Sequence, residues 1–250
     1  EVHHTRVSFA ADVKTRAQEL ADHVNHILEQ SQATKAHLIS HSMGGLDARH
    51  MIVDLPGMAE KVASLTTVGT PHFGSPMADY LIKHGIGEWV DTLSRFINLD
   101  GVHDLATDAC RDFNQRAEPI EAANKVTYQT WSSAAEQACF ILGKSAAIIT
   151  KSEGPNDGLV SLTSQRWQSR LGGSKSIVRH EFPYPTDHLN QLGWWLPADL
   201  EPALTSLSIW KKWKAEYEAC GKRALKVYEQ MATNLQSIER DITATTTPWS

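Results

Sequence analysis

Three polar residues, far apart in the sequence, have the side-chain types that together perform nucleophilic catalysis. Ser42 is the central residue of the stretch SHSMG at residues 40–44, which is close to the G-x-S-x-G pattern of a nucleophile elbow. A serine hydroxyl attacks a carbonyl efficiently only when a base removes its proton and an acid orients that base. Asp157 and His188 follow in the order serine, acid, histidine. The pattern predicts acyl transfer with Ser42 as nucleophile, Asp157 as triad acid and His188 as base.

Each of these residues also has a simpler interpretation. Ser42 fits an ordinary turn of small residues, Asp157 a turn-rich loop, and His188 an exposed loop. Asp187 is adjacent to His188, but neighbouring side chains diverge, so Asp157 is the better partner for the imidazole. The joint occurrence of all three residues, in the required order and each after a predicted strand, favours the catalytic interpretation.

The elements that would position these residues alternate between strands and helices. Apolar residues at helical spacing predict a helix over 13–29, with Asp12 as its N-cap, and a second helix from Met43 to Asp54. Short buried strands are predicted at residues 36–40, 62–69, 125–131 and 176–182. The alternation predicts an α/β protein with a mostly parallel sheet and helices on both faces.

A tight turn between the first strand and the second helix would hold Ser42 in a strained conformation. We expect residues two before and two after the serine, Ser40 and Gly44, to crowd one another, so both must be small. The N-terminal amides of the helix face developing negative charge, and the Met43 amide is the predicted oxyanion donor.

Two later segments leave alternatives open. Ile82 to Ile97 form an apolar helical stripe, which suits either a core-packed helix or a mobile lid that meets an apolar substrate. Residues 202–241 predict one or two helices in which lysines lie near Trp210 and Tyr217. A solvated helix face is favoured there over contact with an anionic membrane surface.

Composition excludes several classes of protein. The 250 residues are 41% hydrophobic, which is enough for a core, and 24 basic against 29 acidic residues give no support to nucleic-acid binding. No apolar run is long enough to span a membrane. Three scattered cysteines favour an intracellular protein, and the histidines show no metal-ligand spacing, so no metal or cofactor is predicted.

With these motifs identified, the chain resembles the triacylglycerol lipases of the α/β-hydrolase superfamily, especially the fungal mitochondrial type related to bacterial true lipases. The matching segments are SHSMGGLDAR (40–49), SLTTVGTPH (64–72), GSP (74–76), EGPNDGLVS (153–161) and DHL (187–189). The resemblance implies a single α/β-hydrolase domain over residues 1–250, with an inserted helical lid at about 80–124 and C-terminal helices at about 202–241. It also implies an acylglycerol or other lipid ester as substrate and contact with a lipid–water interface.

The chain departs from the family at several positions. Ser40 replaces the first glycine of the elbow, Phe73 stands where an arginine is usual, and Asn190 replaces a calcium-binding aspartate, which argues against calcium. The second oxyanion donor normally follows a His-Gly motif before the nucleophile, and the only His-Gly here is residues 84–85. We therefore expect the domain to be N-terminally incomplete, without the first strand and the second oxyanion donor.

The expected function is a serine carboxylic-ester hydrolase, with triacylglycerol lipase as the first interpretation. An acyl-thioesterase or a general carboxylesterase on the same fold would share the triad. A catalytically impaired lipase fragment that binds lipid would also retain these motifs, so the sequence leaves these alternatives open.

Overall fold

A computed structural model describes residues 1–8, 11–85, 99–198 and 207–246 of the chain. Its main sheet has four parallel strands in the order β1-β2-β3-β6. Their bounds are Ala36–His41 for β1, Val62–Val68 for β2, Thr127–Ser132 for β3 and Val178–Glu181 for β6. The predicted parallel α/β architecture is therefore confirmed.

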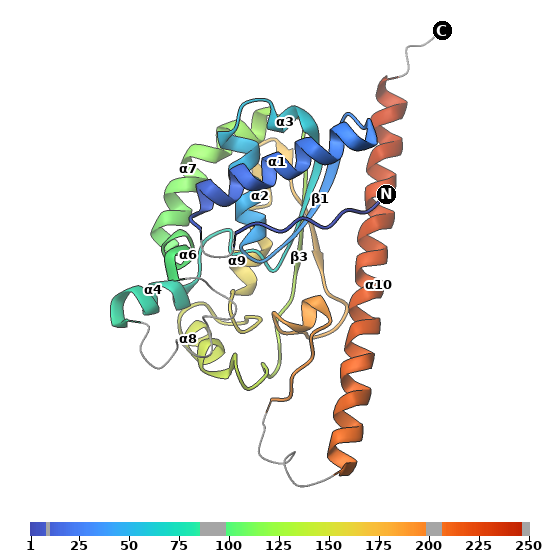
Figure 1. The fold of residues 1–250 in the computed structure, drawn as a ribbon. Helices are drawn as coiled ribbons and strands as arrows, with labels where there is room; N and C mark the ends of the chain where they lie inside the picture. The colour runs from blue at the N-terminus through green and yellow to red at the C-terminus, as the bar shows by residue number, and fades with distance from the viewer. Residues whose placement is uncertain (9–10, 86–98, 199–206, 247–250) are drawn as a thin grey trace.

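Helices cover both faces of this sheet (Figure 1). The elements outside the main sheet are α1 (Val13–Ser31), α2 (Gly44–Asp54), α3 (Met58–Lys61), α4 (Pro76–His84), α6 (Leu99–Asp104), α7 (Thr107–Ala123), α8 (Gly143–Glu153), α9 (Leu162–Arg166), the short strands β4 (Arg170–Leu171) and β5 (Lys175–Ser176), the 3-10 turn η2 (Asn190–Leu192) and α10 (Leu207–Thr246). Because side chains alternate along a strand, Leu65 and Tyr128 pack in the cluster with α1 and α2. Val68 and Trp131 point the other way and pack with α10.

The first helix begins as its sequence predicts. The Asp12 side chain accepts a hydrogen bond from the Thr15 amide at 2.8 Å, which satisfies one of the free amides at the start of α1. The predicted strand over 176–182 is divided in the structure. Gly172 and Gly173, both with positive φ, turn the chain so that β5 pairs with β4, and only β6 joins the main sheet.

The segment between Tyr80 and Asn124 is only partly described. α4 begins at Pro76 after the N-cap Ser75, and Ile82 on this helix is 43% exposed. The rest of the predicted apolar stripe, from Ile86 to Ile97, lies outside the described residues, so the lid stays a prediction. α7 is anchored in the domain, because Phe113 and Glu121 are buried.

Two buried ion pairs fasten α2 to its neighbours. Arg16 on α1 contacts Asp47 at 3.0 Å, and burial raises the pKa of Asp47 to about 6 even though Arg16 opposes that shift. Arg49 binds both carboxylate oxygens of Glu121 on α7 at 2.8 and 2.9 Å. The helix that follows Ser42 is thus held from both sides.

The C-terminal segment forms one helix of 40 residues, α10. Its Cys220, Ala224, Val227 and Met231 are buried and recur at helical spacing. Among the helices of the described residues, none combines the length and the apolar content needed to cross a membrane.

Candidate active site

Ser42 occupies the turn between β1 and α2 in a left-handed backbone conformation, with φ of +55°. Such a conformation costs an L residue about 1–3 kcal/mol, so surrounding bonds must maintain it. The Ser42 amide donates to the Val68 carbonyl at 2.8 Å, and the Thr70 hydroxyl donates to the Ser42 carbonyl at 2.8 Å. The predicted strained turn is therefore present, and it places the serine at the carboxyl end of β1.

The close packing in this turn involves a different glycine from the predicted one. A Cβ atom added to Gly44 would meet no heavy atom within 4 Å outside its own helix. A Cβ on Gly45 would lie 2.1 Å from the Thr70 hydroxyl oxygen. The expectation that Gly44 must be small because of crowding is wrong, since it is Gly45 that faces the neighbouring loop.

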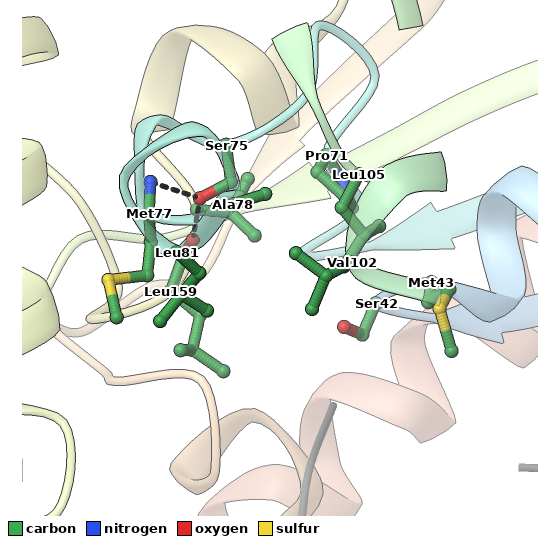
Figure 2. Close-up of a pocket in the computed structure, with 11 residues that line it drawn as sticks. Ser42, Met43, Pro71, Ser75, Met77, Ala78, Leu81, Val102, Leu105 and Leu159 are labelled. Atoms are coloured by element: carbon green, nitrogen blue, oxygen red, sulfur yellow. Dashed lines mark hydrogen bonds between the residues drawn. The ribbon is translucent and has the colours of Figure 1, made fainter. Parts of the chain in front are cut away.

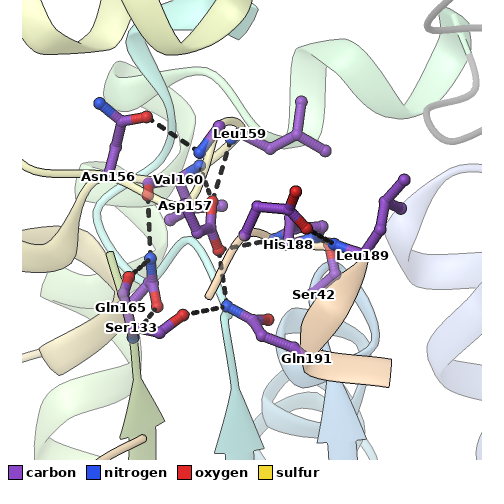
Figure 3. Close-up of polar contacts among 12 residues, drawn as sticks. Ser42, Ser133, Asn156, Asp157, Leu159, Val160, Gln165, His188, Leu189 and Gln191 are labelled. Atoms are coloured by element: carbon purple, nitrogen blue, oxygen red, sulfur yellow. Dashed lines mark hydrogen bonds and ion pairs between the residues drawn. The ribbon is translucent and has the colours of Figure 1, made fainter. Parts of the chain in front are cut away.

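The three predicted catalytic side chains meet in one hydrogen-bonded line (Figure 3). The Ser42 Oγ lies 2.8 Å from Nε2 of His188, and Nδ1 of His188 lies 2.7 Å from Oδ2 of Asp157. Asp157 and His188 are buried, while Ser42 is partly exposed. This arrangement allows the imidazole to take a proton from the hydroxyl while the carboxylate orients the ring.

Backbone amides fix the carboxylate of Asp157. Its Oδ1 accepts hydrogen bonds from the amides of Leu159 at 3.0 Å and Val160 at 2.8 Å. Gly158 makes the turn possible because its φ is +100°. The acid therefore presents its other oxygen, Oδ2, to His188 (Figure 3).

Asp187 has a different role from Asp157. Its carboxylate accepts hydrogen bonds from the amides of Leu189 and Asn190 and from the Cys139 amide. These bonds shape the turn that follows His188, and burial raises the pKa of Asp187. The structure therefore places Asp157, and not the adjacent aspartate, on the imidazole.

An apolar pocket opens beside Ser42 (Figure 2). Ser42 and Met43 line one side, and residues of three other segments line the rest. These include Met77, Ala78 and Leu81 of α4, Val102 of α6, and Leu159. The serine hydroxyl points into this space, with Leu159 across from it. A hydrocarbon chain attached to a carbonyl at Ser42 would therefore meet apolar side chains.

The Met43 amide lies at the N-terminus of α2, next to the serine. Within the described residues this amide forms no hydrogen bond, so it is available to an oxyanion. Its role as oxyanion donor stays a prediction.

In the part of the chain that the structure describes, no group of three or more histidine, cysteine or acidic residues could hold a metal ion. Asn190 lies against the thiol of Cys220.

Two further polar side chains reach this site and were not identified in the sequence. His41 lies with its ring 4.6 Å from that of His188, and Gln191 donates to Asp157. His41 precedes Ser42, the predicted nucleophile, in the chain, which is a weak signal for a role. For Gln191 the sequence contains no signal, because its contacts are with residues far away in the chain.

Comparisons with known proteins find relatives that are named as lipases. The family described as "PGAP1-like alpha/beta domain" matches residues 6–100. Triacylglycerol lipase 2 of Saccharomyces cerevisiae is 29% identical over 199 residues, which cover 76% of this chain and 57% of that protein. A triacylglycerol lipase of Pseudomonas fragi is 27% identical over 230 residues and 74% of each chain. The chain thus spans little more than half of the yeast relative.

Solved structures show the same fold at low sequence identity. The Staphylococcus hyicus lipase superimposes with a TM-score of 0.61 at 18% identity and covers 94% of this chain and 84% of its own. A metagenomic carboxyl esterase superimposes with a TM-score of 0.64 at 17% identity and covers 94% of this chain and 64% of its own. The chain therefore has an α/β-hydrolase fold, and in sequence it is similar to triacylglycerol lipases.

Proposed function

We propose that the chain is a serine carboxylic-ester hydrolase that releases fatty acids from acylglycerols, with Ser42, His188 and Asp157 as its catalytic triad. The observation that carries this proposal is the position of the Ser42 hydroxyl. It lies 2.8 Å from the His188 imidazole and points into the apolar pocket. The relatives named as triacylglycerol lipases support the substrate class.

The first half of the reaction acylates the serine. His188 takes the Ser42 proton as the hydroxyl oxygen attacks the ester carbonyl, and a tetrahedral oxyanion forms. The Met43 amide donates to this oxyanion, aided by its place at the start of α2. Asp157 accepts the Nδ1 proton of His188 in a hydrogen bond and offsets the positive charge of the imidazolium. His188 then protonates the leaving alcohol, and the acyl group remains on Ser42.

The second half of the reaction releases the fatty acid. His188 takes a proton from a water molecule that attacks the acyl-enzyme carbonyl. The tetrahedral intermediate collapses as His188 returns that proton to the Ser42 oxygen. The acyl chain occupies the apolar pocket through both halves, where Leu81, Val102 and Leu159 replace the water around its methylene groups.

We also propose that the N-terminal end of α10 contacts the lipid–water interface. Trp210, Trp213 and Tyr217 continue the helical stripe that is buried farther along α10, but Trp210 is 63% and Tyr217 53% exposed. Residues 207–226 hold six basic and two acidic residues, although the whole chain has a net charge of −5. Exposed aromatic rings among lysines suit the headgroup region of an anionic lipid surface.

Labelling with a fluorophosphonate probe tests the nucleophile. We expect the probe to label the wild-type chain and the Ser152→Ala control, whereas Ser42→Ala stays unlabelled. Hydrolysis of emulsified triolein tests the substrate class beside a soluble butyrate ester. A chain that the probe does not label would overturn the hydrolase proposal. Turnover of the butyrate ester alone would overturn the acylglycerol substrate.

Sedimentation with phosphatidylglycerol vesicles tests the interfacial contact. The double variant Trp210→Ala/Tyr217→Ala should bind these vesicles more weakly than the wild type. Leu225→Ala is the matched control, because Leu225 is 59% exposed on the same helix but lies farther from the aromatic end. Equal binding of the double variant and the wild type would contradict this contact.

A further inference from the structure

The side chain of Gln191 is fully buried beside the proposed triad. The reaction steps above do not use it. It lies on η2, three residues after His188. Its side-chain nitrogen Nε2 is 2.9 Å from Oδ2 of Asp157 and 2.8 Å from the Ser133 hydroxyl. Its oxygen Oε1 is 2.9 Å from Nε2 of His41. One side chain thus joins Asp157 to a second histidine. Figure 3 shows its contacts with Asp157 and Ser133.

The partners of Gln191 determine which way its amide faces. The Asp157 carboxylate only accepts hydrogen bonds, so the atom that faces it must be the NH₂ nitrogen. The second hydrogen of that nitrogen goes to the Ser133 oxygen, and Ser133 donates its own proton to the Thr186 carbonyl at 3.0 Å. Oε1 must then accept from His41, which requires a proton on Nε2 of that ring.

The Asp157 carboxylate has a donor for each of its lone-pair directions. Oδ1 accepts from the backbone amides of Leu159 and Val160, and Oδ2 accepts from His188 Nδ1 and from Gln191. Gln191 and His188 therefore both donate to the same oxygen, Oδ2 of Asp157. Without it, Oδ2 would keep His188 as its single donor, and the two backbone amides on Oδ1 alone would hold the carboxylate in line with the imidazole.

His41 is held neutral at the other end of the amide. Burial, together with the neighbouring His188, lowers the pKa of His41 to about 3. A neutral ring with its centroid 4.6 Å from that of His188 does not oppose the positive charge that His188 takes up in acyl transfer. Gly69 leaves the room for this bridge, because a Cβ there would lie 2.2 Å from Oε1 of Gln191.

We infer that Gln191 is a positioning residue for acyl transfer: it fixes Oδ2 of Asp157 on the His188 imidazole and holds His41 against the same ring. This inference rests on the proposed hydrolase function. The titratable groups around His188 include Asp157, His41 and Asp187, and Gln191 bonds directly to the first two.

Gln165 provides a matched control for Gln191. It is also a buried glutamine, but it bonds only to backbone atoms, namely the amide and carbonyl of Ser133 and the carbonyl of Val160. Gln191→Leu and Gln165→Leu therefore remove carboxamides of equal size. Both variants should lose stability, whereas only Gln191→Leu should change the behaviour of His188. Gln191→Glu keeps the length of the side chain and provides a second variant if the leucine does not fold.

The test compares these variants on a soluble butyrate ester, with rates normalised to the fraction of serine that a fluorophosphonate probe labels. We expect Gln191→Leu to lower kcat about ten- to a hundredfold with little change in KM, because a hydrogen bond to a charged group is lost. The acid limb of its pH–rate profile should move to higher pH, since Asp157 then holds more negative charge against the imidazolium. Gln165→Leu should leave that limb in place.

A second readout does not depend on turnover. We expect the Nδ1 proton of His188 to be deshielded, because Nδ1 lies 2.7 Å from Oδ2 of Asp157. Its NMR signal should move in Gln191→Leu or Gln191→Glu but not in Gln165→Leu. An unmoved signal in either Gln191 variant would overturn the positioning role even if the wild-type chain hydrolysed no ester. If the wild-type chain hydrolyses no ester but the Gln191 variants still shift the His188 signal, the hydrolase proposal alone is overturned.

Discussion

Alanine should disturb the turn that holds Ser42 at one of two adjacent glycines, Gly45, and leave it intact at the other, Gly44. A Cβ on Gly45 would lie 2.1 Å from the Thr70 hydroxyl oxygen and 2.7 Å from its methyl carbon, so the Thr70 side chain must move. That hydroxyl donates to the Ser42 carbonyl and helps maintain the left-handed backbone of the nucleophile. A Cβ on Gly44 meets nothing within 4 Å.

The size of the effect follows from three terms. Overpacking costs about 1–3 kcal/mol, and loss of the Thr70 hydrogen bond costs about 1 kcal/mol. The higher helix propensity of alanine returns up to about 1 kcal/mol. We therefore expect Gly45→Ala to lower the free energy of unfolding by about 1–3 kcal/mol, which in a chain of this length lowers Tm by about 2–12 °C. Gly44→Ala should be neutral or stabilising by up to about 1 kcal/mol.

Thermal unfolding followed by circular dichroism measures the stability term, and hydrolysis of a soluble butyrate ester measures the effect on the nucleophile. A displaced Ser42 should lower kcat of Gly45→Ala by about tenfold or more, because small misplacements of reacting groups are costly. Gly44→Ala should retain the wild-type rate. Equal stability and activity of Gly45→Ala and Gly44→Ala would refute the role of Gly45 in holding this turn.

Three other perturbations test the core, the pH response and the pocket. Glu121→Ala leaves Arg49 buried without its partner and should cost about 3–5 kcal/mol in urea unfolding, whereas Arg116→Ala, at an exposed ion pair, should cost less than about 1 kcal/mol. The pKa of His41 is about 3 in the folded chain against an ordinary 6.5, so between these pH values the unfolded chain binds one more proton than the folded chain. The free energy of unfolding should therefore fall by up to about 1.4 kcal/mol for each pH unit as the pH is lowered from 6.5 towards 3. His41→Asn should reduce that slope by one proton in urea titrations between pH 4 and 6.5, and an unchanged slope would contradict it. Ala78→Leu narrows the pocket and should lower kcat/KM for a palmitate ester about tenfold relative to butyrate, whereas an unchanged ratio would place the acyl chain elsewhere.

Much of the fold follows from local patterns in the sequence. The helix that begins after Asp12 and the strands β1 and β2 form where apolar spacing and caps predict them. The division of the predicted strand at 176–182 depends on a hairpin made by Gly172 and Gly173, where antiparallel pairing with β4 competes with the main sheet. Periodicity alone does not decide between two such pairings, because both strands keep the same alternation.

The three residues of the proposed triad could be found because their order in the chain and their places after strands are shared by many serine hydrolases. The glycine that packs against Thr70 could not be found, because nothing in the sequence distinguishes Gly45 from Gly44. Only the direction of each Cβ on the helix separates them, and that direction brings Gly45 against Thr70. The sequence therefore predicts the three proposed reacting groups, but it does not show that Gly45 is the glycine that packs against Thr70.

Gln191 shows why such support is hidden in a sequence. Its three side-chain partners, His41, Ser133 and Asp157, are 150, 58 and 34 residues away along the chain. Each contact exists only once β1, β3 and the loops after α8 and β6 are placed together. A glutamine on a surface turn would look the same in the sequence, but here the carboxamide is buried against a carboxylate and a histidine whose bonding capacities fix its orientation. Residue types thus indicate the chemistry of the site, whereas the orientation of its side chains depends on contacts that only the folded chain creates.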